Sequence, residues 1–260
     1  MTSPNMPLRG VPTVLHEQNG VMGRANRLLA PRVTRIATGF PKLAHLDARV
    51  RDKIVFTGNP VRPQVIEAAA TPYPVPAAGG DIHMLVFGGS QGAHVMAEVV
   101  PAAVGQLAPD VRARLRIVQQ ARSEDLDEVR ATYAKLGVNA DCAPFFDDLP
   151  RRMAGAHLVI SRSGASTVAE LSAVGRPGIL VPLPHALDQD QRANASVLEQ
   201  AGGAILLPQG DFSPARLASD IAALMNAPDR LAAMAAAAKR AGSVDAAERL
   251  ADLVLQIARR

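Results

Sequence analysis

From residue 82 onward, short apolar runs alternate with longer amphipathic stretches. Short apolar runs bounded by turn residues predict strands, and apolar residues spaced three or four apart predict helices. The predicted strands are 82–87, 115–119, 139–143, 157–161, 178–182 and 204–207. Strands that alternate with helices, and that are apolar enough to be covered on both faces, predict an α/β fold with a parallel, doubly wound sheet.

The predicted helices lie between these strands and after the last of them. They are 93–104, 124–136, 149–155, 167–174, 188–201, 214–226, 229–241 and 246–260. Ser213 precedes Pro214 as an N-cap residue before proline at the first helical position, and three glycines lie where helices should end. These glycines are Gly137, Gly175 and Gly202.

The first 62 residues contain too few elements for a complete domain. Two apolar runs, 12–15 and 53–56, flank a basic helical segment, 23–30. Two or three strands do not bury both faces of a parallel sheet. We therefore expect residues 1–62 to be the remnant of an N-terminal domain with its interdomain linker. Residues 63–241 should form a complete domain, and 242–260 a C-terminal helix that packs back toward the N-terminal part.

The composition is that of a soluble globular protein. Hydrophobic residues make up 48% of the 260 positions, and Cys142 is the only cysteine, which excludes an internal disulfide and suits a reducing cytoplasm. No apolar stretch approaches the ~18 residues of a membrane span, and the start of the sequence lacks a signal peptide. We expect a cytoplasmic protein.

Charge is distributed unevenly. Residues 1–62 contain ten Lys or Arg and three Asp or Glu, whereas the rest contains eighteen and twenty-one. A basic segment of this kind can contact nucleic acid, an anionic membrane or a phosphorylated substrate. It offers almost no aromatic stacking surface, so we expect no nucleic-acid partner. The alternative, that compensating acids lie elsewhere, stays open.

A glycine-rich turn follows the predicted strand 82–87. It contains Gly88, Gly89 and Gly92, together with Ser90 and Gln91. Glycines let the backbone approach an anion, and the next helix directs free N–H groups and its positive end toward it. The turn therefore predicts a phosphate site, although a simple tight turn between strand and helix has the same letters.

Polar motifs follow several other predicted strands. They occupy positions 16–19, 57–62, 144–148, 161–170 and 184–191. In an open α/β sheet, ligands bind outside the carboxyl ends of the strands. Arg62 and the glycine turn suit phosphates, an acid can accept from ribose hydroxyls, and backbone groups can contact a base, which together favours a nucleoside diphosphate.

Each motif also has a structural interpretation. Thr167 with Glu170, and Asp188 with Gln191, have the spacing of capping boxes. Arg62 could be an ordinary surface arginine, and His16 and His185 are single histidines without metal-ligand spacing. The turn lacks the G-x-G-x-x-G order of a nicotinamide dinucleotide site, and no Walker loop or Ser-His-Asp elbow is present. We predict no metal and no cofactor.

The ordered motifs resemble the MurG family of bacterial glycosyltransferases. The matching strings are His-Glu-Gln-Asn at 16–19, Gly-Asn-Pro-Val-Arg at 58–62, Gly-Gly-Ser-Gln-Gly-Ala at 88–93 and Ser-Arg-Ser-Gly-Ala at 161–165, with Thr167 and Glu170. The resemblance runs from about Val11 to the C-terminus. This family transfers N-acetylglucosamine from UDP-N-acetylglucosamine to undecaprenyl-pyrophosphoryl-N-acetylmuramoyl-pentapeptide (lipid I), which gives lipid II in peptidoglycan synthesis.

The resemblance implies a GT-B fold, in which two Rossmann-like domains face each other across a cleft, and an inverting, metal-independent hexosyltransferase. It places the protein peripherally at the cytoplasmic face of the inner membrane, against an anionic surface. Arg62 and Ser90 would contact the diphosphate of the donor, Phe146 uracil through the backbone, Glu170 the ribose and Gln191 the sugar. The other substrate-binding residues that it implies are Gln91, Ser163, Thr167 and the phosphate-loop glycines Gly88, Gly89 and Gly92.

On the acceptor side, the resemblance implies that Asn19 faces the cleft. Family members begin with a Gly-x-Gly-Gly-His loop whose histidine is a candidate base, and this sequence contains no such loop. We therefore assign no catalytic residue, and His16, Glu17 and Asn19 are candidate cleft residues. Three functions stay open: the lipid II-forming transferase, a module that binds UDP-N-acetylglucosamine without transfer, and another GT-B enzyme such as a UDP-sugar 2-epimerase.

Overall fold

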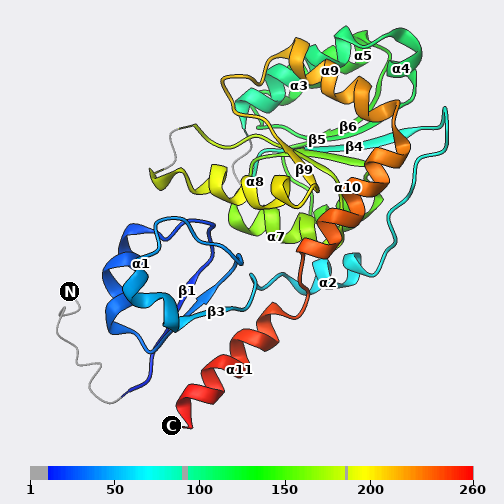
Figure 1. Ribbon diagram of the computed structural model, residues 1–260. Coiled ribbons are helices and arrows are strands. Elements are labelled where there is room, and N and C mark those ends of the chain that lie inside the picture. Colours follow the sequence, from blue (N-terminus) through cyan, green and yellow to red (C-terminus); the bar gives the residue numbers. More distant parts are fainter. Residues whose placement is uncertain (1–10, 90–92, 185–186, 260) are drawn as a thin grey trace.

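The computed structural model describes residues 11–89, 93–184 and 187–259, which form two parallel sheets (Figure 1). The smaller sheet has the strand order β1-β2-β3. Its strands are β1 (Val14–Glu17), β2 (Arg35–Thr38) and β3 (Ile54–Phe56). The central strand β2 was not predicted, because it begins with an arginine and contributes only four residues.

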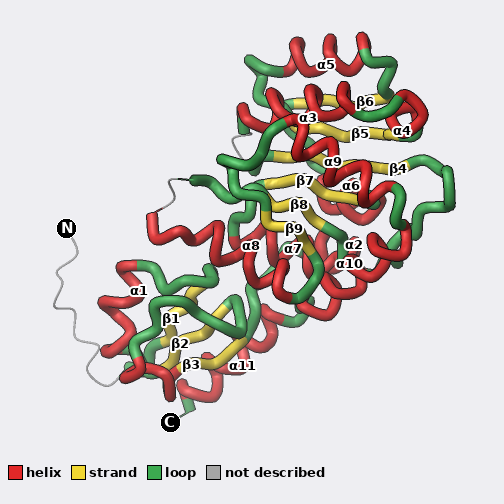
Figure 2. The backbone as a smooth tube through the Cα atoms, turned by 45° about the horizontal axis from the view of Figure 1, so that its top comes forward, coloured by secondary structure: helices red, strands yellow, loops and turns green. Residues whose placement is uncertain are grey.

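The larger sheet has six parallel strands in the order β6-β5-β4-β7-β8-β9, as Figure 2 shows. They are β4 (Ile82–Phe87), β5 (Leu115–Gln120), β6 (Asn139–Ala143), β7 (Leu158–Ser161), β8 (Gly178–Leu180) and β9 (Ala204–Leu206). The chain builds outward from β4 in one direction and then from β7 in the other. The loops after these two strands diverge, and this switch point is where such sheets bind ligands.

Helices cover both faces of the larger sheet (Figure 1). The α-helices are α1 (Arg24–Leu29), α2 (Pro63–Ala69), α3 (His94–Gln106), α4 (Pro109–Ala113), α5 (Leu126–Lys135), α6 (Leu149–Gly155), α7 (Ala165–Val174), α8 (Asp190–Gln200), α9 (Pro214–Met225), α10 (Pro228–Ala241) and α11 (Ala246–Ala258). Short 3-10 helices are η1 (Ala30–Arg32), η2 (Ala48–Lys53) and η3 (Leu187–Gln189). The predicted helices and strands agree with these bounds to within two residues, whereas α2 and α4 were not predicted.

Strand β4 is buried on both sides. Ile82, Met84 and Val86 belong to the core formed with α3, α5 and α9, whereas Leu85 and Phe87 belong to the core formed with α2, α6 and α7. Alternate residues of a strand face opposite sides of the sheet, so a strand covered on both sides is apolar throughout. The expected doubly wound sheet is confirmed.

The three glycines predicted to end helices do so, whereas the two capping boxes suggested by sequence spacing, Thr167 with Glu170 and Asp188 with Gln191, are wrong. Gly137, Gly175 and Gly202 have φ angles of +67°, +74° and +83°, which L side chains rarely adopt. The Ser213 hydroxyl accepts from the backbone N–H of Arg216 at 3.3 Å. This contact is the predicted N-cap of α9.

Helix α7 begins at Ala165, after Gly164, so Thr167 is inside its first turn and does not cap it. Glu170 pairs with an arginine instead of reaching back to Thr167. Helix α8 begins at Asp190, and Asp188 pairs with arginines of α1. In both cases a partner distant in sequence binds the side chain that the local pattern assigns to a cap.

The mostly exposed segment after α2 leads to β4, and it is fixed to the larger sheet. The fully buried Arg176 donates to the carbonyls of Thr71 and Pro72, both at 3.1 Å. The Tyr73 hydroxyl donates to the carbonyl of His157 at 3.0 Å. These contacts position the start of β4.

Two chain segments cross between the sheets. The first runs from β3 to α2, and the second runs from α10 to α11, which lies beside β3 in both views (Figures 1 and 2).

Among the described helices, none combines the length and apolarity needed to cross a bilayer.

Candidate functional site

A pocket of about 370 Å³ opens at the carboxyl edge of the six-stranded sheet. We call it the switch-point pocket. Its lining residues are Pro60, Arg62, Phe87, Gly89, Gln120, Phe145, Phe146, Leu149, Ser166, Thr167 and Glu170. They come from the β3–α2 segment, the ends of β4 and β5, the β6–α6 loop and α7. Five of the predicted site residues therefore lie together: Arg62, Gly89, Phe146, Thr167 and Glu170.

Arg62 and Glu170 form a bidentate ion pair in this pocket. The Nε and Nη2 atoms of Arg62 donate to Oε1 and Oε2 of Glu170, both at 3.0 Å. The Glu170 residue is only 9% exposed, whereas 55% of the Arg62 side chain is exposed. A guanidinium has five N–H donors, so Arg62 retains donors that can bind an anion.

The loop after β6 forms an aromatic wall of the pocket. The Arg152 guanidinium lies 4.2 Å from the centre of the Phe146 ring, and Nε of Arg152 donates to the Asp148 carboxylate at 2.6 Å. This hydrogen bond lowers the pKa of Asp148. The neighbouring Phe145 side chain is exposed. Arg152 therefore fixes one aromatic ring of the wall and leaves the other open to a ligand.

The pocket also contains a residue that the sequence analysis missed. Gln120 is buried at the end of β5, and its Nε2 donates to the carbonyl of Pro144 at 3.1 Å. It thereby holds the aromatic loop. Its place at the carboxyl end of a strand, after Gln119, is the signal that could have identified it, because ligands bind at that edge of such sheets.

The described part of the glycine turn ends at Gly89, whose φ of +90° requires glycine. The predicted residues Ser90, Gln91 and Gly92 lie outside the described residues, and Gly88 precedes them at the end of β4.

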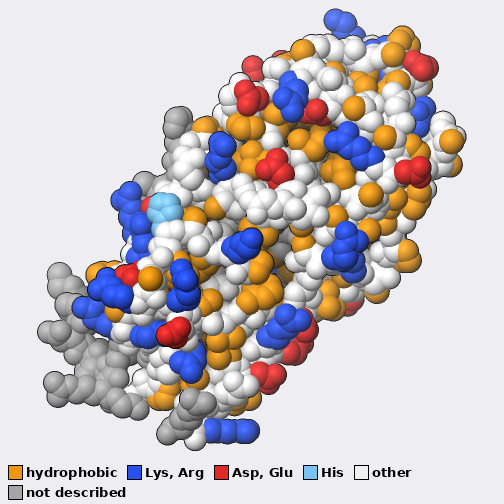
Figure 3. Space-filling model, viewed as in Figure 1, with side chains coloured by type: hydrophobic (Ala, Val, Ile, Leu, Met, Phe, Trp, Pro, Cys, Tyr) orange, Lys and Arg blue, Asp and Glu red, His pale blue; other side chains and the backbone are white. Residues whose placement is uncertain are grey.

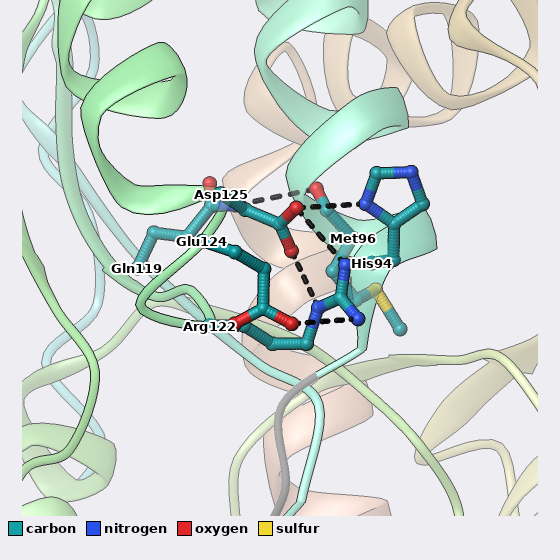
Figure 4. Close-up of polar contacts among 6 residues, drawn as sticks. All are labelled: His94, Met96, Gln119, Arg122, Glu124 and Asp125. Atoms are coloured by element: carbon teal, nitrogen blue, oxygen red, sulfur yellow. Dashed lines mark hydrogen bonds and ion pairs between the residues drawn. The ribbon is translucent and has the colours of Figure 1, made fainter.

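A polar cluster fixes the start of α3 immediately after this turn (Figure 4). Asp125 accepts from Nε of Arg122 at 2.6 Å and pairs with Nδ1 of His94 at 2.9 Å. The hydrogen bond from Arg122 lowers the pKa of Asp125, so this carboxylate is ionised at neutral pH. Nε2 of Gln119 donates to the carbonyl of Met96 at 3.2 Å. The helix that follows the glycine turn is therefore tied to the ends of β5 and α5.

The loop after β1 is organised by Glu17. This residue is 2% exposed, and its carboxylate accepts from the backbone N–H groups of Asn19 at 3.0 Å and Gly23 at 2.9 Å, and from Nδ2 of Asn26 at 2.7 Å. Burial lowers the pKa of His16, whose Nε2 lies 3.3 Å from the carbonyl of Gly58. Both side chains hold the loop in place, and Asn19, which is half-buried, is more exposed than Glu17.

Three predicted residues form a second group that does not line the switch-point pocket. The buried Ser163 hydroxyl donates to the carbonyl of Gln191 at 2.8 Å, and Oε1 of Gln191 accepts from the Leu183 N–H at 3.0 Å. Asn19 joins them through Asn194 of α8. Within residues 11–89, 93–184 and 187–259, no three His, Cys, Asp or Glu side chains are grouped as metal ligands.

Comparison with known proteins agrees with this arrangement. The model of the glycosyltransferase family 28 C-terminal domain matches residues 83–250. A protein of Rhodopseudomonas palustris (strain ATCC BAA-98 / CGA009) is 59% identical over 251 residues, which are 96% of this chain and 69% of the relative. It is named UDP-N-acetylglucosamine--N-acetylmuramyl-(pentapeptide) pyrophosphoryl-undecaprenol N-acetylglucosamine transferase. The crystal structure of Acinetobacter baumannii MurG superposes with a TM-score of 0.79 at 30% identity, covering 96% of this chain and 69% of that one.

The chain belongs to the MurG family. The resemblance of the motifs is thereby confirmed, and the chain spans about two thirds of the length of this relative. A UDP-GlcNAc 2-epimerase of Neisseria meningitidis superposes with a TM-score of 0.62 at 15% identity, covering 95% of this chain and 70% of that one. At that identity only the fold is shared, so the comparisons do not favour the epimerase alternative over the MurG family.

Proposed function

We propose that this chain transfers N-acetylglucosamine from UDP-N-acetylglucosamine to the muramoyl C4 hydroxyl of lipid I, and so forms lipid II. One observation carries the proposal: the switch-point pocket gathers Arg62, Gly89, Phe146, Thr167 and Glu170 from segments up to 108 residues apart. These are residues that the family motifs assign to the donor. The relative that is 59% identical is named for this reaction.

In this proposal the pocket binds the UDP part of the donor. The free N–H donors of Arg62 and the N-terminus of α3 take the diphosphate, since both attract anions. Uracil lies at the aromatic loop of Phe146 and contacts its backbone, and the Glu170 carboxylate accepts from the ribose hydroxyls. Because Arg62 and Glu170 bind each other in the structure, UDP must share or replace this contact.

The reaction is an inverting displacement at the anomeric carbon of N-acetylglucosamine. The muramoyl C4 oxygen forms the new bond, the bond to the UDP oxygen breaks, and the hydroxyl proton passes to a base. Arg62 and the α3 dipole stabilise the charge that develops on UDP. Glu17 already accepts three hydrogen bonds in a buried position, so we assign it to supporting the loop and not to accepting this proton.

The acceptor is a lipid, and we propose that α1 and η1 face an anionic membrane surface at the cytoplasmic side. Leu28 is 68% exposed and Leu29 is 45% exposed, with Arg24 and Arg32 beside them. Figure 3 shows Lys and Arg side chains gathered over this part of the molecule. Exposed leucines among arginines suit a surface with apolar tails and anionic head groups.

The experiment that tests the function scores binding and transfer separately. The purified chain is incubated with labelled UDP-N-acetylglucosamine and a lipid I analogue. Binding with transfer supports the proposal, whereas binding without transfer leaves only the donor-binding module. The variant Glu170→Gln should bind UDP-N-acetylglucosamine at least about 10-fold more weakly, because the hydrogen bond between residue 170 and the ribose is then no longer assisted by a charge. Glu67→Gln, on the exposed side of α2, is the matched control and should bind as the unchanged chain does.

A further inference from the structure

One buried carboxamide connects the loop after β1 with the loops of the larger sheet. Asn194 of α8 is 0% exposed. Its Oδ1 accepts from the backbone N–H of Gly20 at 2.7 Å, and its Nδ2 donates to Oδ1 of Asn19 and to the carbonyl of Ser163, both at 3.1 Å. The two partners in the loop are 174 and 175 residues away in sequence.

The backbone of this loop packs closely against α8 at Gly20. A Cβ atom on Gly20 would lie 3.1 Å from the backbone carbon and oxygen of Ala193. On its other side, the loop accepts a hydrogen bond from Nδ2 of Asn59 to the carbonyl of Gln18, at 2.8 Å. The position of Asn19 is therefore set by direct backbone packing as well as by hydrogen bonds.

Asn194 also fixes the orientation of the Asn19 carboxamide. Oδ1 of Asn19 accepts from Asn194, so Nδ2 of Asn19 points to the other side, 3.5 Å from Oε1 of Glu17. That contact is long and uses one of two N–H bonds, and Asn19 is half-buried. Asn19 therefore offers an N–H donor to a group that approaches it from that side.

Only an asparagine satisfies all three partners at this position. Gly20 needs an acceptor, whereas Asn19 Oδ1 and the Ser163 carbonyl each need a donor. Aspartate supplies no donor, leucine supplies no polar group, and glutamine is one carbon longer at a position that is fully buried. Buried polar groups left without partners are costly, so the side chain is matched to this contact.

We propose that Asn194 is a positioning residue for the acceptor. Asn194 holds Nδ2 of Asn19 so that it can donate to an oxygen of the acceptor. The hydrogen bond from Asn194 to the Ser163 carbonyl fixes Asn19 relative to the loop after β7, in which the Ser163 hydroxyl donates to the Gln191 carbonyl. This inference rests on the proposed transferase function. It adds that one carboxamide aligns the acceptor side with the donor side.

Two aspartate variants test the two halves of this contact. Asn194→Asp keeps the acceptor for Gly20 but loses both donors, so Asn19 turns its Nδ2 to the new carboxylate. Asn19→Asp keeps an oxygen for Asn194 but loses the Nδ2 donor. Each should lower kcat/KM for the lipid I analogue about 10- to 100-fold, because a misplaced or missing contact disturbs alignment. The Kd for UDP should change less than about twofold, since neither side chain lines the switch-point pocket.

Ser172→Ala is the matched control for a loss of stability alone. It removes a buried hydrogen bond of 2.7 Å within α7, from the Ser172 hydroxyl to the Val168 carbonyl, and leaves the Asn194 contacts intact. Transfer by this variant should equal that of the unchanged chain. If both aspartate variants transfer at the unchanged rate, or lose UDP affinity in parallel with transfer, the proposal is wrong.

A second measurement does not need transfer. In NMR spectra, the side-chain NH₂ of Asn194, identified by its loss in Asn194→Asp, should exchange slowly with solvent. The NH₂ of Asn19 should shift in the same variant. If the chain binds UDP-N-acetylglucosamine without transfer, the proposed function fails, and these spectra still decide whether Asn194 holds the Asn19 carboxamide. Rapid exchange of the Asn194 NH₂, or an unshifted Asn19 NH₂, overturns the positioning role.

Discussion

Arg62 and Glu170 show how one pair of side chains serves two purposes. Their bidentate contact joins the β3–α2 segment to α7, and the same atoms face the switch-point pocket. The carboxylate, which is mostly buried, is neutralised by an exposed guanidinium that keeps free donors. An arriving diphosphate can therefore bind Arg62 without leaving Glu170 in an apolar environment.

At the residue scale, we expect Arg62→Ala to weaken binding of UDP about 10- to 100-fold, which corresponds to the loss of charge-assisted hydrogen bonds of about 1.5–3 kcal/mol. Affinity for uridine should change much less, because uridine has no phosphate. Isothermal titration with both ligands measures the difference. Arg112→Ala is the control, since Arg112 binds only backbone carbonyls near α4 among the described residues. An equal loss for UDP and uridine would contradict the assignment.

The residue scale also shows what local sequence cannot predict. The spacing of Thr167 and Glu170 fits a capping box, but Arg62, 108 residues away, binds the glutamate. Asn194 lies in a helical pattern in which a polar residue normally marks the exposed side. Its complete burial depends on the loop at Asn19 and Gly20, which no periodicity within α8 indicates.

At the element scale, the side chain of His157, which directly precedes β7, joins that strand to β4. Nδ1 of His157 accepts from the backbone N–H of His83 at 2.8 Å. Burial, and then the nearby His83 and Arg176 charges, lower the pKa of His157 to about 4. The side chain is therefore neutral at pH 7 and accepts this bond through an unprotonated nitrogen.

This pKa predicts how stability depends on pH. The unfolded chain binds a proton at His157 near pH 6.5, whereas the folded chain does so only near pH 4. The neutral His157 side chain therefore contributes about 3 kcal/mol to the free energy of unfolding above pH 6.5. This contribution is lost progressively as the pH falls to about 4. His157→Asn keeps an acceptor but does not titrate. Urea unfolding between pH 4 and 7 should show a smaller loss for this variant, and parallel curves would contradict the prediction.

The crossing between β3 and α2 gives a second prediction at this scale. Gly58 has a φ of +84°, and a Cβ there would lie 3.1 Å from Cβ of Ala246 in α11. Gly79 has a similar φ of +71° but nothing within 4 Å. Gly79→Ala should cost about 1 kcal/mol from backbone strain alone. Gly58→Ala should cost at least about 1 kcal/mol more, because it also overpacks α11. Urea unfolding of both variants measures the difference. Equal losses in the free energy of unfolding would contradict the prediction, because α11 would then move aside without cost.

The elements themselves were largely predictable. Strands such as β4 are uniformly apolar because helices cover both faces, and glycines such as Gly175 end helices with positive φ. Strand β2 and helices α2 and α4 escaped prediction because each is short and depends on its neighbours. Order along the chain also indicated the pocket, since parallel strands bring their carboxyl ends to one edge.

At the scale of the whole molecule, positive charge is concentrated in the part built around β1–β3, where Leu28 and Leu29 are exposed among arginines. We expect vesicles containing anionic lipid to bind the chain at low salt and to release it as salt rises, because salt screens the arginines. Leu28→Ser should reduce binding at every salt concentration. Val75→Ser, at an exposed position on the connecting segment, is the control. Cosedimentation measures both, and binding that is indifferent to salt would contradict the membrane assignment.

The two chain crossings limit how the halves of this molecule can move. Gly58 in one crossing lies against Ser243 and Ala246 in the other, so both covalent connections pass through nearly the same place. The halves also touch away from these connections, where Gly20 packs against Ala193 and Asp188 pairs with Arg24 and Arg27. Any opening between the halves must therefore break those noncovalent contacts, whereas the two covalent connections can stay packed against each other.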